Sequence, residues 1–250
     1  EAGSVLDTVV TSGGISGVHH GNKNRFLTAS TNVKDILNNE SINTVVIVTR
    51  HDAHASQVID ALNAGKHVFV EKPLALTLDE IDQIDKAYQK ANMSNEVKLM
   101  VGFNRRYAPH IVKMKELLSS HRSPKSIIMT INAGPISVEH WVQDALVGGG
   151  RIVGEGCHFI DLMRHLVGYS IIDFTATMMG SVPGVEVRED KASITLSFSD
   201  GSFGTILYLA NGGSAFPKER IEVFCDDAVL QMDNYRVLTG YGWSGFKKMR

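Results

Sequence analysis

The feature that most constrains the fold is an alternation of apolar runs and amphipathic helical patterns between residues 44 and 101. Thr44–Thr49 and His67–Glu71 are short runs dominated by β-branched and aromatic side chains, as in buried strands. Between them, residues 53–64 place apolar side chains at helical spacing and stop at Gly65. This order predicts a βαβ unit with parallel strands, and the unbroken apolar runs predict helices on both faces of the sheet.

The same pattern continues into a second helix and a third strand. Thr77 and Glu80 have the spacing of a capping box, in which each side chain binds the backbone N–H of the other residue. An apolar stripe at helical spacing follows, and Val97–Val101 is the expected third strand. Residues 1–103 are therefore predicted to form a partial dinucleotide-binding Rossmann domain with a doubly wound parallel sheet.

From residue 104 onward the pattern changes to longer, alternating strands, which is typical of an antiparallel sheet. The expected elements are a helix near residues 109–118 and strands near 125–133, 171–180, 192–198, 203–209, 221–224 and 228–231. Asp200 and Gly201 predict a tight hairpin between two of these strands. Residues 104–250 are thus expected to form a second, α+β domain built on an antiparallel sheet.

Composition narrows the class of partner. With 43% hydrophobic and 21% charged residues, 250 residues can build a sizeable core. A net charge of -2 offers no basic surface for nucleic acid, and no apolar run approaches a membrane span, so we expect a cytoplasmic protein with a small-molecule partner. Cys157 and Cys225 are expected to be buried thiols rather than a disulfide.

Glu71, Lys72 and Pro73 stand where the second predicted strand ends. Loops at the carboxyl ends of parallel strands converge on a crevice that binds ligands. A lysine in such a crevice loses solvation and can handle protons, and the adjacent proline fixes the backbone that carries it. A solvated lysine is the alternative that these residues leave open.

The glycine motif expected of a dinucleotide-binding domain, G-x-G-x-x-G, is absent. The nearest segment, Ser12–Gly17, follows the strand-like Thr8–Val10 with different spacing and without a helical pattern after it. We interpret it as a glycine-rich loop, with a phosphate cradle as the alternative. The absence predicts that the chain is a fragment whose first strand and glycine loop lie upstream, so the 250 residues alone would bind cofactor weakly and be inactive.

The preference between NAD and NADP is weakly marked. An acidic residue after the second strand of the domain would bind the ribose 2′-hydroxyl of NAD, and residues 11–13 offer none. This favours NADP slightly. Lys23 or Arg25 could meet a 2′-phosphate, although solvated loop charges are the simpler interpretation.

Four motifs occur in order along the chain: Val48–His54, Ala61–Ala75, Val101–Arg106, and Gly148–Gly150 leading to Gly156–Asp161. Together they resemble the glucose-fructose oxidoreductase, inositol dehydrogenase and rhizopine-catabolism (Gfo/Idh/MocA) family of nicotinamide-dependent oxidoreductases. Thr49–His54 and Gly154–His158 are most similar to the subset fused behind a zinc-type alcohol-dehydrogenase-like region, which would also account for a missing N-terminus.

The resemblance implies that Lys72 and His158 lie near the nicotinamide and the reacting carbon, with Asp161 binding substrate or orienting the histidine. It also implies a cofactor site after the strands of the first domain and a substrate site in the second. The expected cofactor residues are Ser12, Thr49, Arg50, His51, His54, Glu71, Lys72 and Pro73, and the expected substrate residues are Asn104, Arg105, Arg106 and Glu155. The bond between Lys72 and Pro73 is expected to be cis, as it often is in the family.

One position departs from the family pattern. Many members have aspartate four residues before the histidine, where this chain has Gly154, with Glu155 next to it. Either Glu155 takes over the acidic role, or the substrate and the proton path differ from those of the sugar-alcohol dehydrogenases.

The chemistry gives His158 and Asp161 their expected roles. Oxidation of an alcohol by a nicotinamide moves hydride from carbon and needs a base for the hydroxyl proton. His158 is the expected base, with a core histidine as the alternative; Asp161 lies one helical turn on, with a surface carboxylate as its alternative. His158, Asp161 and His165 also have the spacing of a metal-binding helix face, but no nearby cysteine or glutamate cluster completes it, so no metal is expected.

These predictions converge on an NAD(P)-dependent oxidoreductase that transfers hydride to or from a sugar, sugar-nucleotide or polyol carbon. Its active site is expected between the two domains, and the antiparallel sheet is expected to form a homodimer or higher homo-oligomer. The alternative is a non-catalytic binding or dimerisation module derived from the same fold.

Overall fold

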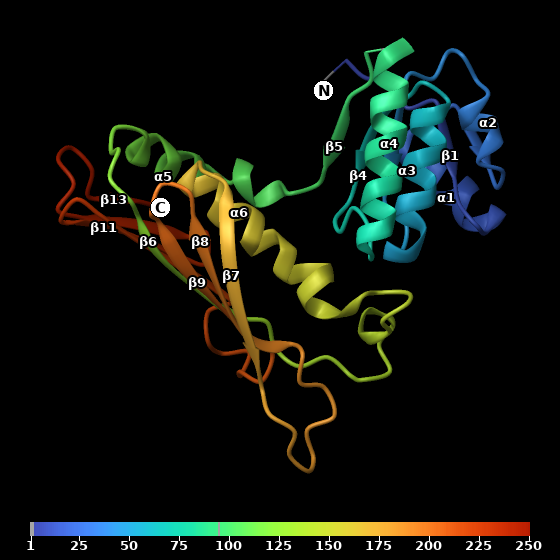
Figure 1. Ribbon diagram of the computed structural model, residues 1–250. Helices are drawn as coiled ribbons and strands as arrows, with labels where there is room; N and C mark the ends of the chain where they lie inside the picture. Colours follow the sequence, from blue (N-terminus) through green and yellow to red (C-terminus); the bar gives the residue numbers. More distant parts are fainter. Residues whose placement is uncertain (1–2, 95) are drawn as a thin grey trace. The chain divides into compact units, whose positions relative to one another are not determined.

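The computed structural model describes residues 3–94 and 96–250, apart from the side chain of Ser94. It divides into two compact units, residues 1–102 and 103–250, which are shown in Figure 1 and are described separately below.

The N-terminal unit is built from short parallel strands and helices. Its elements are β1 (Thr8–Val10), α1 (Gly14–Asn24), β2 (Thr28–Ser30), α2 (Lys34–Leu37), β3 (Thr44–Ile47), η1 (His51–Ala53), α3 (His54–Asn63), β4 (His67–Val70), α4 (Leu78–Ser94) and β5 (Leu99–Val101). Strands β3, β4 and β5 pair in parallel in that order, and β1 pairs in parallel with β2. The predicted βαβ arrangement is therefore confirmed.

Helices α3 and α4 pack together against β3, β4 and β5 (Figure 1). The core between them includes Val58 and Leu62 from α3 and Val70 from β4, each 1% exposed or less. On the opposite face, the register pairs Val46 with Phe69 and Phe69 with Met100. Val46 is 61% and Met100 42% exposed, so this face of the three strands is partly exposed within the described residues.

The capping box at the start of α4 is confirmed. The carboxylate of Glu80 accepts hydrogen bonds from the backbone N–H groups of Leu76 and Thr77 at 2.8 and 3.0 Å, and Thr77 Oγ1 accepts one from the Glu80 N–H at 3.2 Å. These bonds satisfy donors that a helix N-terminus leaves without intrahelical partners. The local sequence pattern therefore specifies where α4 begins.

The interpretation of Ser12–Gly17 as a loop is wrong, because α1 begins at Gly14. Gly17 and Gly21 are the buried residues of this helix and lie one turn apart on one face. A Cβ at Gly17 would lie 2.8 Å from Thr11 Oγ1, and one at Gly21 would lie 3.3 Å from Val9 Cγ1. The glycines thus let the helix approach its own strands closely, which an apolar-stripe pattern does not reveal.

The C-terminal unit is an eight-stranded sheet with two main helices on one face. Its elements are η2 (Asn104–Tyr107), α5 (Pro109–Ser119), β6 (Ser126–Asn132), η3 (Trp141–Gln143), η4 (Ile152–Gly156), α6 (Cys157–Val167), β7 (Ile171–Met178), β8 (Lys191–Phe198), β9 (Phe203–Leu209), β10 (Glu219–Cys225), β11 (Ala228–Asp233), β12 (Val237–Tyr241) and β13 (Lys248–Met249). The strand order is β13-β12-β11-β10-β6-β9-β8-β7, and all neighbours pair antiparallel except β6 and β9.

Helices α5 and α6 cover one face of this sheet (Figure 1). Buried residues alternate with more exposed ones along β8 and β9, as expected for a sheet with one open face. The Asp200-Gly201 hairpin joins these two strands as predicted, with Gly201 at φ +88°. The structure therefore confirms a Rossmann-type unit followed by a mostly antiparallel sheet unit. None of the helices in the described part of the chain is both long and apolar enough to cross a membrane.

The packing of α1 leads to a stability prediction. Gly17→Val should lower the free energy of unfolding by about 1–3 kcal/mol, because its branched side chain would be forced against Thr11. Gly180→Val is the control, since Gly180 is exposed and a Cβ there would meet nothing within 4 Å. Urea unfolding of both variants measures the difference, and equal effects would contradict the packing role of Gly17.

Candidate active site

His54 joins the segments that follow β3 and β4. It is the first residue of α3 and is fully buried, with 0% exposure. Its ring Nδ1 lies 2.7 Å from the carbonyl oxygen of Pro73, and its Nε2 lies 3.1 Å from that of Thr49. Because both partners are acceptors, the neutral ring donates to one of them at a time and the protonated ring to both. One side chain thereby holds two strand exits beside each other.

Glu71, Lys72 and Pro73 follow β4 directly, at the carboxyl end of a parallel strand. The Lys72–Pro73 peptide bond is cis, as the family resemblance implies. Gly102, which follows the neighbouring strand β5, leaves room for the carboxylate of Glu71, since a Cβ there would lie 3.0 Å from Glu71 Oε2. Lys72 is thus placed at a strand exit with a defined backbone.

The other residues predicted to bind cofactor lie in two places of the same unit. Thr49, Arg50 and His51 follow β3, where Thr49 Oγ1 donates to Gln57 Oε1 at 2.9 Å and the His51 ring lies 5.8 Å from the His54 ring. Ser12 lies in the exposed segment between β1 and α1. The β3 and β4 exits are therefore brought together, and the cofactor roles stay predictions.

His158 lies in the first turn of α6, just after a π-helical turn, η4, which carries Gly154 and Glu155. π-Helical turns are rare and occur frequently at functional sites. The imidazole is 5% exposed and meets the ring of Phe103 edge to face, with centroids 6.0 Å apart and planes at 77°. A buried ring packed in this way has a fixed orientation, which a base needs.

Asp161 lies one turn after His158 and binds Arg106. Arg106 donates from Nε to Asp161 Oδ2 at 2.6 Å and from Nη2 to Oδ1, a bidentate pair. The Asp161 side chain is 9% exposed, and the bonds to it raise the pKa of Arg106. The aspartate therefore fastens η2 to α6, on the helix that carries His158.

Arg105 and Asn104, both predicted to bind substrate, differ in their surroundings. Arg105 donates to both carboxylate oxygens of Glu219 on β10, at 3.0 and 2.6 Å, and its guanidinium lies 4.6 Å above the Phe159 ring. Asn104 is exposed. This geometry gives Arg105 a role in holding the unit together and does not support its assignment to substrate.

Glu155 is enclosed by three donors. Its carboxylate accepts hydrogen bonds from Lys218 Nζ at 2.9 Å, from Arg151 Nη2 at 3.0 Å and from the hydroxyl of Tyr208. Burial raises the pKa of Glu155, but the bonds from Tyr208, Lys218 and Arg151 outweigh it and lower the pKa from 4.5 to about 2. A carboxylate this acidic is a poor proton acceptor near neutral pH.

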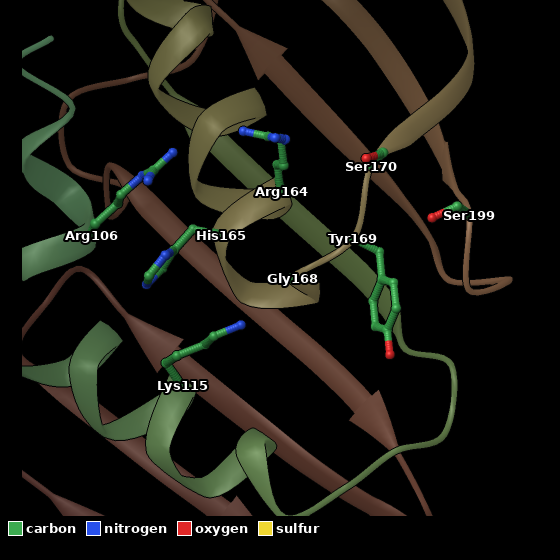
Figure 2. A pocket seen from close by; sticks show the side chains of 8 residues that line it. All are labelled: Arg106, Lys115, Arg164, His165, Gly168, Tyr169, Ser170 and Ser199. Atoms are coloured by element: carbon green, nitrogen blue, oxygen red, sulfur yellow. The ribbon is translucent and has the colours of Figure 1, made fainter. Parts of the chain in front are cut away.

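A polar cavity of about 420 Å³ lies at the C-terminal end of α6. Figure 2 shows the side chains that line it: Arg106, Lys115, Arg164, His165, Gly168, Tyr169, Ser170 and Ser199. Burial lowers the pKa of His165, and the positive charges of Arg106 and Lys115 lower it further. Of the predicted substrate and catalytic residues, Arg106 alone borders this cavity, so it is separate from the ring of His158.

The helix face of His158, Asp161 and His165, where no metal was expected, carries Asp161 in an ion pair with Arg106. In the described residues, the cluster with metal-ligand geometry is a different one, His121, Cys225 and Asp226. Both cysteines of the chain are free, as expected; Cys225 is buried, whereas Cys157 is only partly buried, contrary to the expectation.

Sequence reasoning missed Tyr208, Lys218 and Arg151 as partners of Glu155. One signal was present, because Tyr208 stands at an inward position of the alternating strand β9, and a buried tyrosine hydroxyl needs a polar partner. No local pattern identified that partner, which lies 53 residues earlier in the chain.

The acidity of Glu155 leads to a pH prediction. Its folded pKa of about 2 lies below 4.5, so its contribution to stability is present above pH 4.5 and is lost as the pH falls toward 2. Glu155→Gln should lower the free energy of unfolding by about 1–3 kcal/mol at pH 7, with the difference from wild type shrinking between pH 5 and pH 2. Urea unfolding against pH measures this, with Glu116→Gln as an exposed control.

Two family models match the chain, one in each unit. The first is described as an oxidoreductase family with an NAD-binding Rossmann fold and matches residues 17–103. The second is the GFO/IDH/MocA C-terminal domain and matches residues 113–231. Together they account for most of the chain.

The relatives include two inositol dehydrogenases. Myo-inositol 2-dehydrogenase of Thermotoga maritima is 26% identical over 211 residues, which cover 82% of this chain and 60% of the relative. Inositol 2-dehydrogenase of Rhizobium meliloti is 28% identical over 211 residues, which cover 81% of this chain and 62% of the relative. The chain therefore spans about 60% of the length of these relatives.

A solved structure shares the whole described architecture. Levoglucosan dehydrogenase in complex with NADH and levoglucosan superposes with a TM-score of 0.83 over 98% of this chain and 70% of that protein, at 22% sequence identity, which establishes the fold. Because models of one family match both units and the architecture agrees, the chain belongs to the Gfo/Idh/MocA oxidoreductase family.

Proposed function

We propose that the whole protein is an NAD(P)-dependent oxidoreductase that moves hydride between the nicotinamide and a carbon of a sugar, sugar nucleotide or polyol. The observation that carries this proposal is that each family model covers one of the two predicted catalytic groups: residues 17–103 include Lys72, and residues 113–231 include His158. The inositol and levoglucosan dehydrogenases among its relatives support a carbohydrate-like substrate.

The exits of β3 and β4 fit a nucleotide cofactor. Parallel strands end there side by side, and His54 holds the backbone after both strands in place. Thr49, Arg50, His51, Glu71, Lys72 and Pro73 line these exits and are proposed to hold the cofactor together with Ser12 and His54. When bound, the nicotinamide supplies the hydride acceptor or donor.

His158 is proposed to accept the hydroxyl proton as the substrate alcohol is oxidised, and to return it in the reverse direction. The hydrogen on the carbon leaves with its electron pair as hydride, so the proton on oxygen is the one that needs a base. The packing of Phe103 on the imidazole supports this role because it fixes the direction in which the ring points. Lys72 is proposed to assist by donating a hydrogen bond to the substrate oxygen.

Asp161 is proposed as a positioning residue rather than a second base. Its carboxylate is already bound in two places by Arg106 and is nearly buried. The pair holds η2 against α6, and η2 follows directly on Phe103. Glu155 is proposed to maintain the structure around the glycine-containing turn, because its three donors leave it strongly acidic.

The catalytic roles are tested by substitution in the whole protein. His158→Ala should lower kcat by about 10²–10⁴-fold without changing the unfolding temperature by more than a few degrees, and Lys72→Ala should lower kcat by a similar factor. Asp161→Asn should lower kcat less and leave the pH profile of kcat in place. Full activity of either alanine variant on every sugar and polyol that the wild type oxidises would show its assigned role to be wrong.

We also propose a modest preference for NADP over NAD. The segment after β1 offers Thr11, Ser12 and Gly13 and no carboxylate that would bind a ribose 2′-hydroxyl and repel a 2′-phosphate. In the whole protein, NADPH should bind more tightly than NADH. Ser12→Asp should reverse the order, whereas Ser41→Asp, which adds the same charge in a remote exposed turn, should not. Fluorescence titration gives both dissociation constants, and tighter NADH binding by wild type would contradict the preference.

Self-association through the open face of the eight-stranded sheet is a further part of the proposal. Ile128, Phe203 and Phe224 on this face are 40–52% exposed. Arg220 and Glu222 form an ion pair on this face, with Arg220 Nη2 2.7 Å from Glu222 Oε1. In a two-fold related dimer, Arg220 of one copy could therefore lie opposite Glu222 of the other. The expected state is a homodimer or a higher homo-oligomer.

The dimer proposal is tested by placing a charge in that face. Phe224→Glu should convert the wild-type oligomer into monomers in sedimentation velocity, because like charges would meet across a two-fold axis. Leu146→Glu, at an 84% exposed loop position, is the control and should leave the oligomer intact. A monomeric wild-type protein would refute the proposal.

The similarity of two motifs to members fused behind a zinc-type alcohol-dehydrogenase-like region stays a prediction, as do the upstream segment and the cytoplasmic location. The complete reading frame tests the first two: a zinc-type alcohol-dehydrogenase-like region encoded before residue 1 would support them.

Cofactor titration distinguishes an oxidoreductase from the alternative, a non-catalytic binding or dimerisation module. A folded whole protein that binds neither NADH nor NADPH is not an oxidoreductase of this kind.

A further inference from the structure

A group of three side chains at one end of the C-terminal sheet takes no part in the proposed reaction. His121 follows α5, and Cys225 and Asp226 lie at the end of β10 and in the turn to β11. Their ligand atoms, His121 Nδ1, Cys225 Sγ and a carboxylate oxygen of Asp226, all lie within 4.8 Å of one another. An imidazole, a thiol and a carboxylate are thus gathered from two segments more than 100 residues apart.

We propose that His121, Cys225 and Asp226 form a binding site for Zn²⁺ or a related transition metal. Thiolate, imidazole and carboxylate are the three ligand types that Zn²⁺ uses in proteins. Mg²⁺ and Ca²⁺ take all-oxygen ligand sets, so a site with one sulfur and one nitrogen excludes them.

The distances suit a small rearrangement around a metal ion. His121 Nδ1 lies 2.7 Å from Asp226 Oδ2, and Cys225 Sγ lies 3.7 Å from the same oxygen. Tetrahedral zinc with bonds of about 2.0–2.3 Å holds its ligand atoms about 3.3–3.6 Å apart. The metal would replace the hydrogen bond between His121 and Asp226, with side-chain movements on the order of 1 Å.

The surroundings hold the ligands and leave one side open. The ring of Trp243 meets the imidazole of His121 edge to face at 4.7 Å and 69°, which limits rotation of the histidine. The side chains of His121 and Asp226 are 28% and 37% exposed, whereas Cys225 is 5% exposed. A metal can therefore enter from solvent, and water can occupy the fourth position.

Binding at this place would tie two parts of the unit together. His121 belongs to the segment that connects α5 with β6, and the other two ligands belong to the β10–β11 hairpin. A metal that binds the folded protein but not the unfolded chain stabilises the folded state. The gain grows with the logarithm of the ratio of the metal concentration to the dissociation constant. The site is therefore expected to act structurally.

The test uses the whole protein after removal of metal with a chelator. Titration with Co²⁺ should give visible d–d bands and a thiolate-to-metal charge-transfer band, and Zn²⁺ should displace the Co²⁺ and raise the unfolding temperature. Asp226→Asn and Cys225→Ser should each weaken Co²⁺ binding by at least about 100-fold. Loss of a residue that only hydrogen-bonds a metal ligand costs about 10–100-fold, so a larger loss marks a direct ligand. Asp226 is partly exposed, so its substitution should leave the fold intact. Cys225→Ser should also remove the charge-transfer band.

Cys157→Ser and His140→Gln are the controls, because they remove a thiol and an imidazole outside the cluster. Both should bind Co²⁺ as wild type does, and excess Mg²⁺ or Ca²⁺ should not compete. Absence of a charge-transfer band at saturating Co²⁺ would overturn the proposal. So would a folded Asp226→Asn variant that binds Co²⁺ with the affinity of wild type. That second result would mean that other side chains, such as His19 and His20, hold the metal.

Discussion

Two adjacent arginines hold the C-terminal unit around its candidate base. Arg106 binds Asp161 on α6, and Arg105 binds Glu219 on β10, each through two hydrogen bonds. The two carboxylates are 9% and 7% exposed, so loss of either arginine would leave a nearly buried charge without its partner. The short segment η2 is thereby fixed to a helix and to a strand at once, and Phe103, the residue before it, is held against His158.

A single histidine performs a comparable task in the N-terminal unit without an ion pair. His54 is completely buried, and its two ring nitrogens face carbonyl oxygens that follow different strands. Buried carbonyl groups need donors, and a histidine ring placed between two of them can donate its N–H to either one. In both units, the residues with expected chemical roles, Lys72 and His158, are placed by neighbours that bind backbone or charge.

The proposed roles differ among the polar residues because their partners differ. Glu155 stands next to the position where many family members carry aspartate, but its bonds to Tyr208, Lys218 and Arg151 make it strongly acidic. Arg105 is likewise occupied by Glu219. Charged residues close to a motif therefore divide into those that can meet substrate and those that maintain the fold, and hydrogen-bond geometry separates the two groups.

The sequence by itself determined the alternation of strands and helices between residues 44 and 101, the capping box of α4, the Asp200-Gly201 hairpin and the position of Lys72 at a strand exit. Each follows from a local pattern, because periodicity, caps and turns depend on neighbours a few residues away. Only the tertiary structure decided that Gly17 and Gly21 lie in a helix, that Arg105 pairs with Glu219 114 residues away, and that Tyr208 reaches Glu155. Those contacts form between segments that are distant in sequence and that meet only when the sheets pack. The spacing of residues within one segment therefore cannot predict them.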